Sequence, residues 1–181
     1  MNAQKLMTMR ILWGALFSST VIYLVVVVVL RAQGAELAGT AAPPGLAPVF
    51  ALLAVVIAAV SIALPRKISR DALLRLELKV SERAADERMF SEGKRRPRRF
   101  SDPAEARERA FPVLQTAFIL GMALAESIAI FGFTLLLMGL SLTVALPFFA
   151  VCWVLMVGRF PVVKKLEQQL VEVFDADLED G

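Results

Sequence analysis

A single glutamate interrupts a long run of apolar residues in the second half of this chain. The run reads "GMALAESIAIFG" (residues 121–132), and Glu126 is its only charged residue. Glu126 lies about 20 Å from either end of a helix spanning the apolar stretch from 112 to 138, which places it near a bilayer midplane. A charge at that depth costs about 3 kcal/mol on insertion scales, and burial disfavours the anion, so we expect a protonated carboxyl.

Two explanations for this carboxyl stay open. In the first, Glu126 forms a structural hydrogen bond, for example to Ser127, Thr134 or a backbone carbonyl. In the second, it binds and releases a proton as part of the protein's function. No other acid or base lies within the apolar runs, so both explanations depend on Glu126.

Small residues recur at every fourth position beside this glutamate. Spacing by four brings side chains onto one face of a helix, and small side chains let a second helix approach closely in a membrane. We therefore expect a close helix–helix contact along this ridge, either within the chain or between copies. The residues of the ridge are Ala117, Gly121, Ala125, Ala129 and Gly132.

The stretch "ALAESIAIFGF" (residues 123–133) resembles the glutamate helix of the proteolipid (c) subunit of rotary F- and V-type ATPases. The resemblance extends over residues 117–140. It implies that Glu126 is an ion-carrying carboxylate, and that the second apolar run, the loop after it and the third apolar run form a hairpin with its loop in the cytoplasm. The hydroxyl of Ser127 also resembles that of sodium-binding proteolipids.

The ion that the resemblance implies depends on the other oxygen ligands. Sodium needs several oxygens to replace its water, and the sodium-binding proteolipids take a side-chain amide from the partner helix. The second apolar run offers no Asn or Gln, and Ser61 is its only polar side chain. If Glu126 carries an ion, we therefore expect a proton.

The rest of the chain has the composition of an integral membrane protein. Of its 181 residues, 57% are hydrophobic, above the roughly 45–50% of soluble domains. Apolar runs of this length without charge are typical of transmembrane helices. We expect an all-α fold with four transmembrane helices, the first a retained anchor rather than a cleaved signal peptide. The expected spans are 11–30, 47–64, 112–138 and 142–157.

The distribution of basic residues predicts the orientation in the membrane. Residues 66–110 contain 14 Lys and Arg against 9 Asp and Glu, and the segments before the first span and after the fourth are also basic. We expect both termini and this loop in the cytoplasm, in a bacterial inner membrane. The predicted units are a hairpin (1–65), a basic cytoplasmic loop (66–111), a second hairpin (112–158) and a C-terminal segment (159–181).

The cytoplasmic segments carry their own local signals. Pro65 should end or kink the second helix. Residues 69–90 have helical periodicity, the Gly- and Pro-containing basic run after them favours a flexible link, and Pro103 suits the first turn of a new helix. An amphipathic helix with an acidic end is expected after Pro161.

The basic run in the loop predicts binding to acidic groups. Anionic lipid headgroups are the simplest partner, and an acidic protein segment, such as this chain's own 175–180, is the alternative. Nucleic acid is not expected, because no recognition module accompanies the charge. The basic residues are Lys94, Arg95, Arg96, Arg98 and Arg99.

The composition disfavours most catalytic chemistry. The chain has no histidine, one cysteine (Cys152) and no glycine-rich phosphate loop, so we expect no metal site, no cofactor and no enzymatic activity. Two functions stay open. The chain is a proton-binding or proton-translocating subunit, or a scaffold or assembly subunit in which Glu126 is structural. Both imply another membrane subunit or further copies of this chain as partners.

Overall fold

The computed structural model describes residues 3–33, 43, 45–76, 80–82, 98–100, 103–161, 168, 171–174 and 176–177. The main elements are four helices: α1 (Ala3–Ala32), α2 (Leu46–Arg75), α3 (Pro103–Leu137) and α4 (Leu142–Gly158). Three short strands accompany them: β1 (Val80–Glu82), β2 (Arg98–Phe100) and β3 (Ala176–Asp177). Residues 171–174 are also helical. The fold is therefore all-α apart from these strands.

Within the described residues, three helices are long and apolar enough to cross a membrane. These segments are Leu6–Ala32, Leu46–Arg75 and Ala104–Leu137. The fourth helix, α4, is equally apolar but has only 17 residues, which makes it about 26 Å long against a hydrocarbon layer of about 30 Å. Three long apolar helices indicate an integral, multi-pass membrane protein, and whether α4 also spans stays a prediction.

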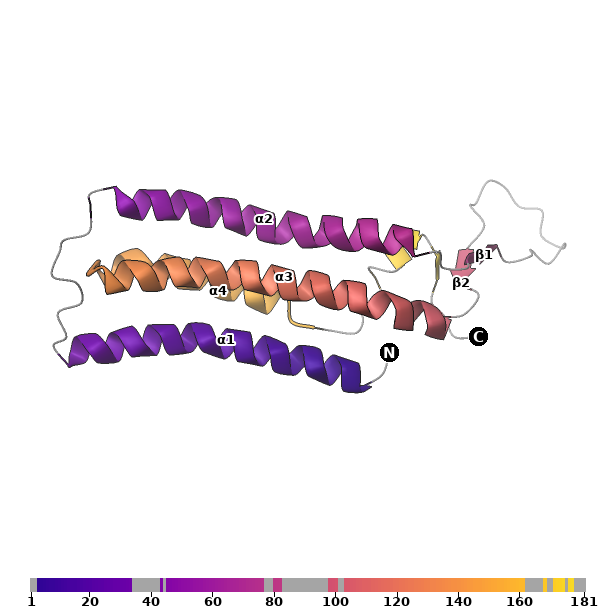
Figure 1. The fold of residues 1–181 in the computed structure, drawn as a ribbon, viewed down its shortest axis with the longest axis horizontal. Helices are drawn as coiled ribbons and strands as arrows, with labels where there is room; N and C mark the ends of the chain where they lie inside the picture. Colours follow the sequence, from indigo (N-terminus) through magenta and orange to yellow (C-terminus); the bar gives the residue numbers. More distant parts are fainter. Residues whose placement is uncertain are drawn as a thin grey trace, which may run out of the picture.

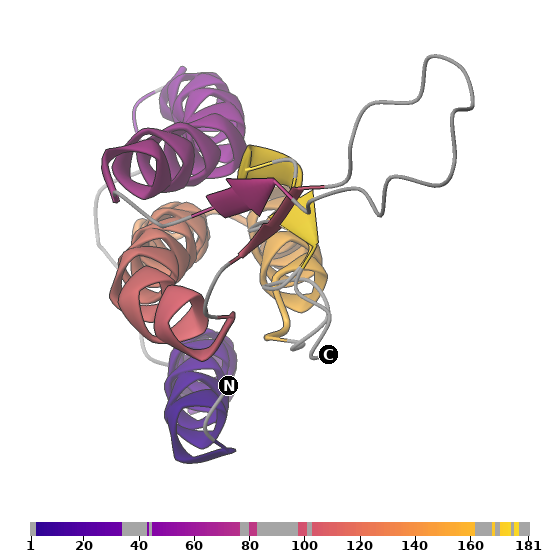
Figure 2. The same ribbon diagram turned by 90° about the vertical axis from the view of Figure 1, so that its right-hand side faces the viewer.

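The helices lie along one common direction, with α3 in contact with the other three (Figures 1 and 2). Helix α1 runs parallel to α3, whereas α2 and α4 run antiparallel to it (Figure 1). The N-terminus, the strands and the first turns of α3 lie at one end of the bundle, and the α3–α4 turn lies at the other (Figure 1). Which end of the bundle faces the cytoplasm stays a prediction from the basic residues.

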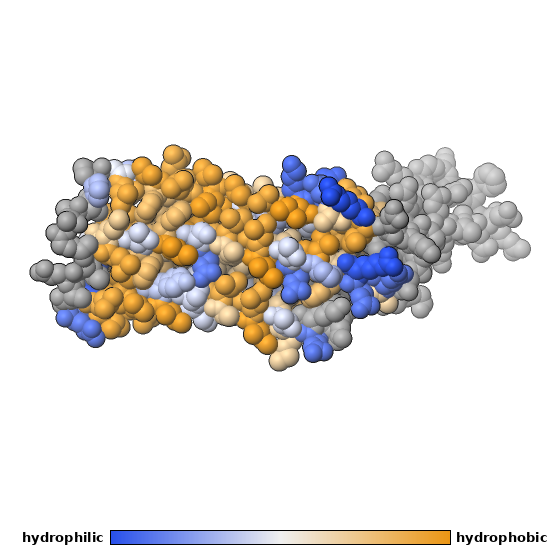
Figure 3. All heavy atoms as spheres, viewed as in Figure 1, coloured by the Kyte–Doolittle hydropathy of each residue, from blue (hydrophilic) through white to orange (hydrophobic). Residues whose placement is uncertain are grey.

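The surface is apolar over most of its length. Figure 3 shows apolar side chains over the body of the bundle and charged ones gathered toward the end where α2 and α3 extend. Many large apolar side chains on α1 and α2 are exposed, among them Ile22, Val25, Leu52 and Val55. Such a surface is expected where lipid, rather than water, is the solvent.

The turn between α3 and α4 is fixed by glycine and by an arginine from α1. Gly139 has a φ of +84°, and the bonds Gly139 N–H to Leu136 O and Leu140 N–H to Leu135 O form a Schellman ending for α3. Arg31 at the end of α1 donates to the carbonyls of Leu136 and Leu140. The ends of α1 and α3 are thereby joined at the end of the bundle that holds the α3–α4 turn.

Pro65 was expected to end or kink the second helix, and the first of these outcomes is wrong, because α2 continues through Pro65 to Arg75. Proline lacks the N–H that would bond the carbonyl four residues earlier, which here belongs to Ser61. Arg159, just beyond α4, donates to that Ser61 oxygen. A helix can pass a proline inside a membrane when another group bonds the freed carbonyl.

The connection between α2 and α3 also differs from its prediction. The helix expected over 69–90 ends at Arg75, and β1 follows at Val80–Glu82. Part of the expected flexible link is strand β2, which pairs antiparallel with β1 and parallel with β3. The pairing of β2 with β3 brings the backbone of the basic run alongside that of the acidic C-terminal segment, at Arg99 and Asp177. Residues 83–97 lie outside the described part of the chain.

A small apolar cluster joins the C-terminal segment to the helices at the end of the bundle where α2 ends and α3 begins. Its buried members come from α2 and α3: Leu73, Ala106, Ala110 and Leu114. Val171, Val173 and Phe174 pack against them. The helix expected after Pro161 is described only at Gln168 and over 171–174.

The orientation can be measured with single cysteines in a Cys152-less background. Cysteine at Ser81, in β1, should resist a membrane-impermeant thiol reagent applied from outside the cell. Cysteine at Ala41, in the connection between α1 and α2 and outside the described residues, should be labelled. Labelling at Ser81 or protection at Ala41 would contradict the orientation.

Candidate functional site

The carboxyl of Glu126 faces α1 rather than α2. Its Oε1 lies 2.6 Å from Ser19 Oγ and 3.1 Å from Tyr23 Oη. Ser19 and Tyr23 are four residues apart and therefore share one face of α1. All three side chains are half-buried. The carboxyl of Glu126 therefore contacts α1, whereas the neighbouring ridge of small residues faces α2 and α4.

The hydrogen-bond partners suggested by the sequence are engaged elsewhere. Ser127 Oγ donates to Ala123 O at 3.0 Å, and Thr134 Oγ1 donates to Ile130 O at 2.8 Å. Both bonds stay within α3, as serine and threonine hydroxyls commonly do in membrane helices. The structure therefore does not bring the predicted ion ligand Ser127 to Glu126.

The Ser19 hydroxyl carries one hydrogen but lies close to two other oxygen atoms. Its Oγ is 2.7 Å from Leu16 O as well as 2.6 Å from Glu126 Oε1. A carbonyl oxygen only accepts, and a hydroxyl donates once. If Ser19 donates to Leu16, the short contact to Glu126 needs a hydrogen on the carboxyl. If Glu126 is ionised, Ser19 turns its hydrogen to the carboxylate. The same oxygen positions therefore suit both protonation states.

Aromatic side chains position α1 against the other helices at this depth. Tyr23 packs on Phe133 of α3, with ring centroids 5.3 Å apart. Trp153 Nε1 of α4 donates to Thr20 Oγ1 at 3.0 Å, and Trp13 Nε1 donates to Met156 O at 2.9 Å. These two bonds attach α1 to α4, which fixes the face of α1 that carries Ser19.

The ridge of small residues is buried throughout. A side-chain carbon added at Gly121 would lie 3.2 Å from Pro65 Cγ of α2, and one at Gly132 would lie 2.9 Å from Phe148 Cβ of α4. Opposite ends of the ridge thus contact different helices within the chain. The other members are Ala117, Ala125 and Ala129.

Of the five basic residues predicted to bind lipid or a partner, two are described. Arg98 and Arg99 belong to strand β2, whereas Lys94, Arg95 and Arg96 lie outside the described residues. The described residues contain no group of three or more acidic, Cys or His side chains able to hold a metal. Cys152 is buried in α4.

Ser19 and Tyr23 were missed by the sequence reasoning, although a signal exists. The first apolar run contains "FSSTVIY", in which three adjacent hydroxyl residues and a tyrosine interrupt aliphatic residues. Ser19 lies about 20 Å before the end of α1, and Glu126 lies about 16 Å before the end of the parallel α3. A comparison of how far each polar residue lies from the end of its helix would have suggested that Ser19 and Glu126 are neighbours.

Comparison with known protein families, curated proteins and solved structures finds no match to this chain.

Proposed function

We propose that this chain is a multi-pass membrane subunit in which Glu126 takes up and releases a proton between α1 and α3. The observation that carries the proposal is the position of Ser19 Oγ, within hydrogen-bonding distance of both Leu16 O and Glu126 Oε1. Rotation of one hydroxyl compensates the loss of the carboxyl proton, so no helix has to move when the charge appears.

Tyr23 supports the charged form. Its hydroxyl donates to Glu126 Oε1 whether or not the carboxyl carries a proton. Two hydroxyl donors on one carboxylate reduce the cost of the anion in a medium that offers no water. Exchange with bulk solvent needs water beside Glu126. A second subunit or a further copy of this chain, packed against the half-exposed site, would provide the path.

Only one part of the likeness to proteolipid subunits supports this proposal, namely a helical hairpin with the glutamate on its second helix. Helices α2 and α3 form the hairpin that the likeness implies, with the glutamate on its second helix. The hydrogen-bond partners of the carboxyl, however, come from α1, a helix outside that hairpin. Both hydrogen-bond partners of the proposed proton site therefore come from the same chain as Glu126. They are not supplied by neighbouring copies in a ring.

A carbodiimide that attacks protonated carboxyls tests the proposal. Glu126 should be modified faster as the pH falls. Sodium should not protect it, because the described side chains bring only the hydroxyls of Ser19 and Tyr23 to the carboxyl, whereas sodium needs several oxygens to replace its water. Asp71, exposed at the cytoplasmic end of α2, serves as the internal comparison. Protection by sodium would assign the site to that ion, and no modification of Glu126 at any pH would remove the proton-exchange proposal.

The second candidate function is a scaffold in which Glu126 is permanently protonated. It is favoured by the same two hydrogen bonds, which join α1 to α3 without any outside group. Glu126→Gln separates the two functions, since a glutamine amide can donate to Ser19 but cannot release a proton. A scaffold should keep its assembly and its cellular role with this substitution, whereas a proton carrier should keep assembly alone.

A further inference from the structure

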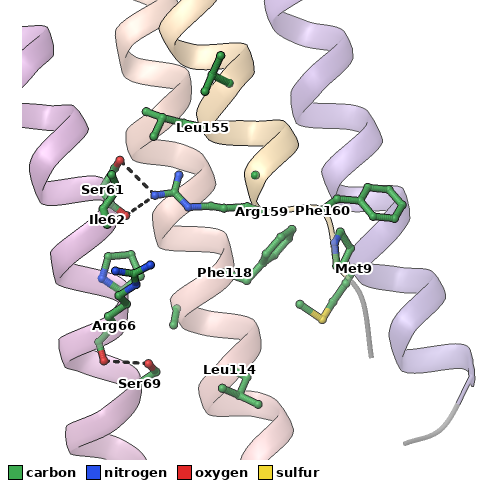
Figure 4. Close-up of a pocket in the computed structure, with 15 residues that line it drawn as sticks. Met9, Ser61, Ile62, Arg66, Ser69, Leu114, Phe118, Leu155, Arg159 and Phe160 are labelled. Atoms are coloured by element: carbon green, nitrogen blue, oxygen red, sulfur yellow. Dashed lines mark hydrogen bonds between the residues drawn. The ribbon is translucent and has the colours of Figure 1, made fainter. Parts of the chain in front are cut away.

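A second polar site lies at the cytoplasmic end of α4. Helix α4 stops at Gly158, while α1, α2 and α3 continue toward the cytoplasm (Figure 1). Because α4 is shorter than its neighbours at this end, a cavity of about 430 Å³ lies between the helices. Figure 4 shows its lining: Arg159 reaches across from the end of α4 to Ser61, and Arg66 lies one turn further along α2.

The cavity combines positive charge with an apolar wall. Arg66 and Arg159 both line it, and they are close enough to repel each other. No carboxylate is among its described lining residues. Leu114, Phe118 and Leu155 supply the apolar side. Two cations that have no counter-ion among the described lining residues, beside apolar surface, are costly unless an anion joins them.

Arg159 keeps donors available for such an anion. Its Nη1 donates to Gly121 O at 2.7 Å, and its Nη2 donates to the carbonyl and hydroxyl oxygens of Ser61. These bonds occupy three of the five N–H groups of a guanidinium. The side chain of Arg66 is exposed and forms no ion pair with the described residues. Arginine donors are suited to phosphate oxygens.

The depth of the cavity matches the headgroup region of the cytoplasmic leaflet. Arg66 lies about 30 Å along α2 from Leu46, and Gly121 lies about 24 Å along α3 from Leu137. A hydrocarbon layer is about 30 Å thick. Arg66 is thus at its cytoplasmic edge and the Arg159 guanidinium slightly inside it, with the apolar wall alongside.

We propose that this cavity binds one anionic phospholipid of the cytoplasmic leaflet, with its phosphate between Arg66 and Arg159 and an acyl chain along Phe118 and Leu155. The lipid neutralises the two guanidinium groups and fills the space under the short α4. This site is separate from Glu126 and from the basic run in the loop, and it does not depend on the proton-binding function.

The test is native mass spectrometry of the full chain in detergent, titrated with phosphatidylglycerol and, separately, phosphatidylcholine. Phosphatidylglycerol should bind more tightly by at least fivefold, and Arg66→Gln should weaken it by about fivefold, the effect of one basic group near a phosphate. Lys67→Gln removes an adjacent exposed charge that does not line the cavity, and it should change the affinity less than twofold.

A second variant tests the cavity rather than the charge. Gly158 lines the cavity, and a side-chain carbon there would meet nothing within 4 Å. Gly158→Leu should therefore take up part of the cavity and lower lipid occupancy without lowering thermal stability. Gly14→Leu is the matched control, because that position in α1 is equally open. Equal binding of the two lipids, equal effects of Arg66→Gln and Lys67→Gln, or full displacement by water-soluble glycerol phosphate would each overturn the proposal.

Discussion

Replacing Arg159 by glutamine is expected to lower the free energy of unfolding by about 3 kcal/mol. Arg159 joins the end of α4 to α2 and α3 through Ser61 and Gly121. Its most important partner is the Ser61 carbonyl, which Pro65 leaves without its helical donor. Glutamine is too short to bond both helices, so this oxygen loses its partner at a depth where little water is available.

Thermal unfolding in detergent, followed by circular dichroism, measures this effect. Arg159→Lys should fall between wild type and Arg159→Gln, because a lysine ammonium keeps the charge but lacks the planar arrangement of donors. Arg70→Gln is the control, since Arg70 is an exposed residue of α2, and it should change stability by no more than about 0.5 kcal/mol. Equal stability of Arg159→Gln and Arg70→Gln would mean that Arg159 does not hold the bundle together.

Alanine at Gly132 is expected to destabilise the protein by about 2 kcal/mol through overpacking. The new carbon would lie 2.9 Å from Phe148 Cβ, 3.0 Å from Phe149 Cε2 and 3.1 Å from Ala145 O. The Ala145 carbonyl belongs to the backbone of α4 and cannot rotate away, so α3 and α4 have to separate. The stability lost through this separation exceeds the stability that replacing glycine by alanine normally adds to a helix.

The same substitution at Gly14 should have the opposite sign. A side-chain carbon there meets nothing within 4 Å, so Gly14→Ala should stabilise α1 by about 0.5–1 kcal/mol, the ordinary difference in helix propensity. Both variants are measured in the same detergent by the same unfolding assay. If both substitutions raise stability, α3 and α4 do not approach each other as closely as the structure has them.

The sequence predicted those parts of the fold that depend on one segment at a time. Long uncharged runs identified α1, α2 and α3, because a helix that crosses lipid must be apolar over its own length. The buried face of α3 was predicted from the four-residue spacing of small residues such as Ala125. The basic residues predict that both termini and the connection between α2 and α3 face the cytoplasm, and this stays a prediction.

The parts that were not predicted depend on contacts between segments. Ser19 meets Glu126 only because Trp153 and Trp13 attach α1 to α4 at one rotation, and no pattern within α1 encodes that rotation. Pro65 has the local signal of a helix end, but a residue almost 100 positions later in the sequence bonds the carbonyl that it frees. The strand pairing of Arg99 with Asp177 is equally remote in sequence.

The proposed proton exchange takes place at the Glu126 carboxyl, which has the Ser19 hydroxyl as its hydrogen-bond partner. Infrared difference spectroscopy of the protonated-carboxyl band in lipid, titrated over pH, tests it most directly. If Glu126 exchanges a proton, the band is present at neutral pH, disappears reversibly at higher pH, is absent from Glu126→Gln and shifts in frequency in Ser19→Ala. A band that is missing at neutral pH, or one that stays unchanged as the pH is raised, would rule out proton exchange at this carboxyl.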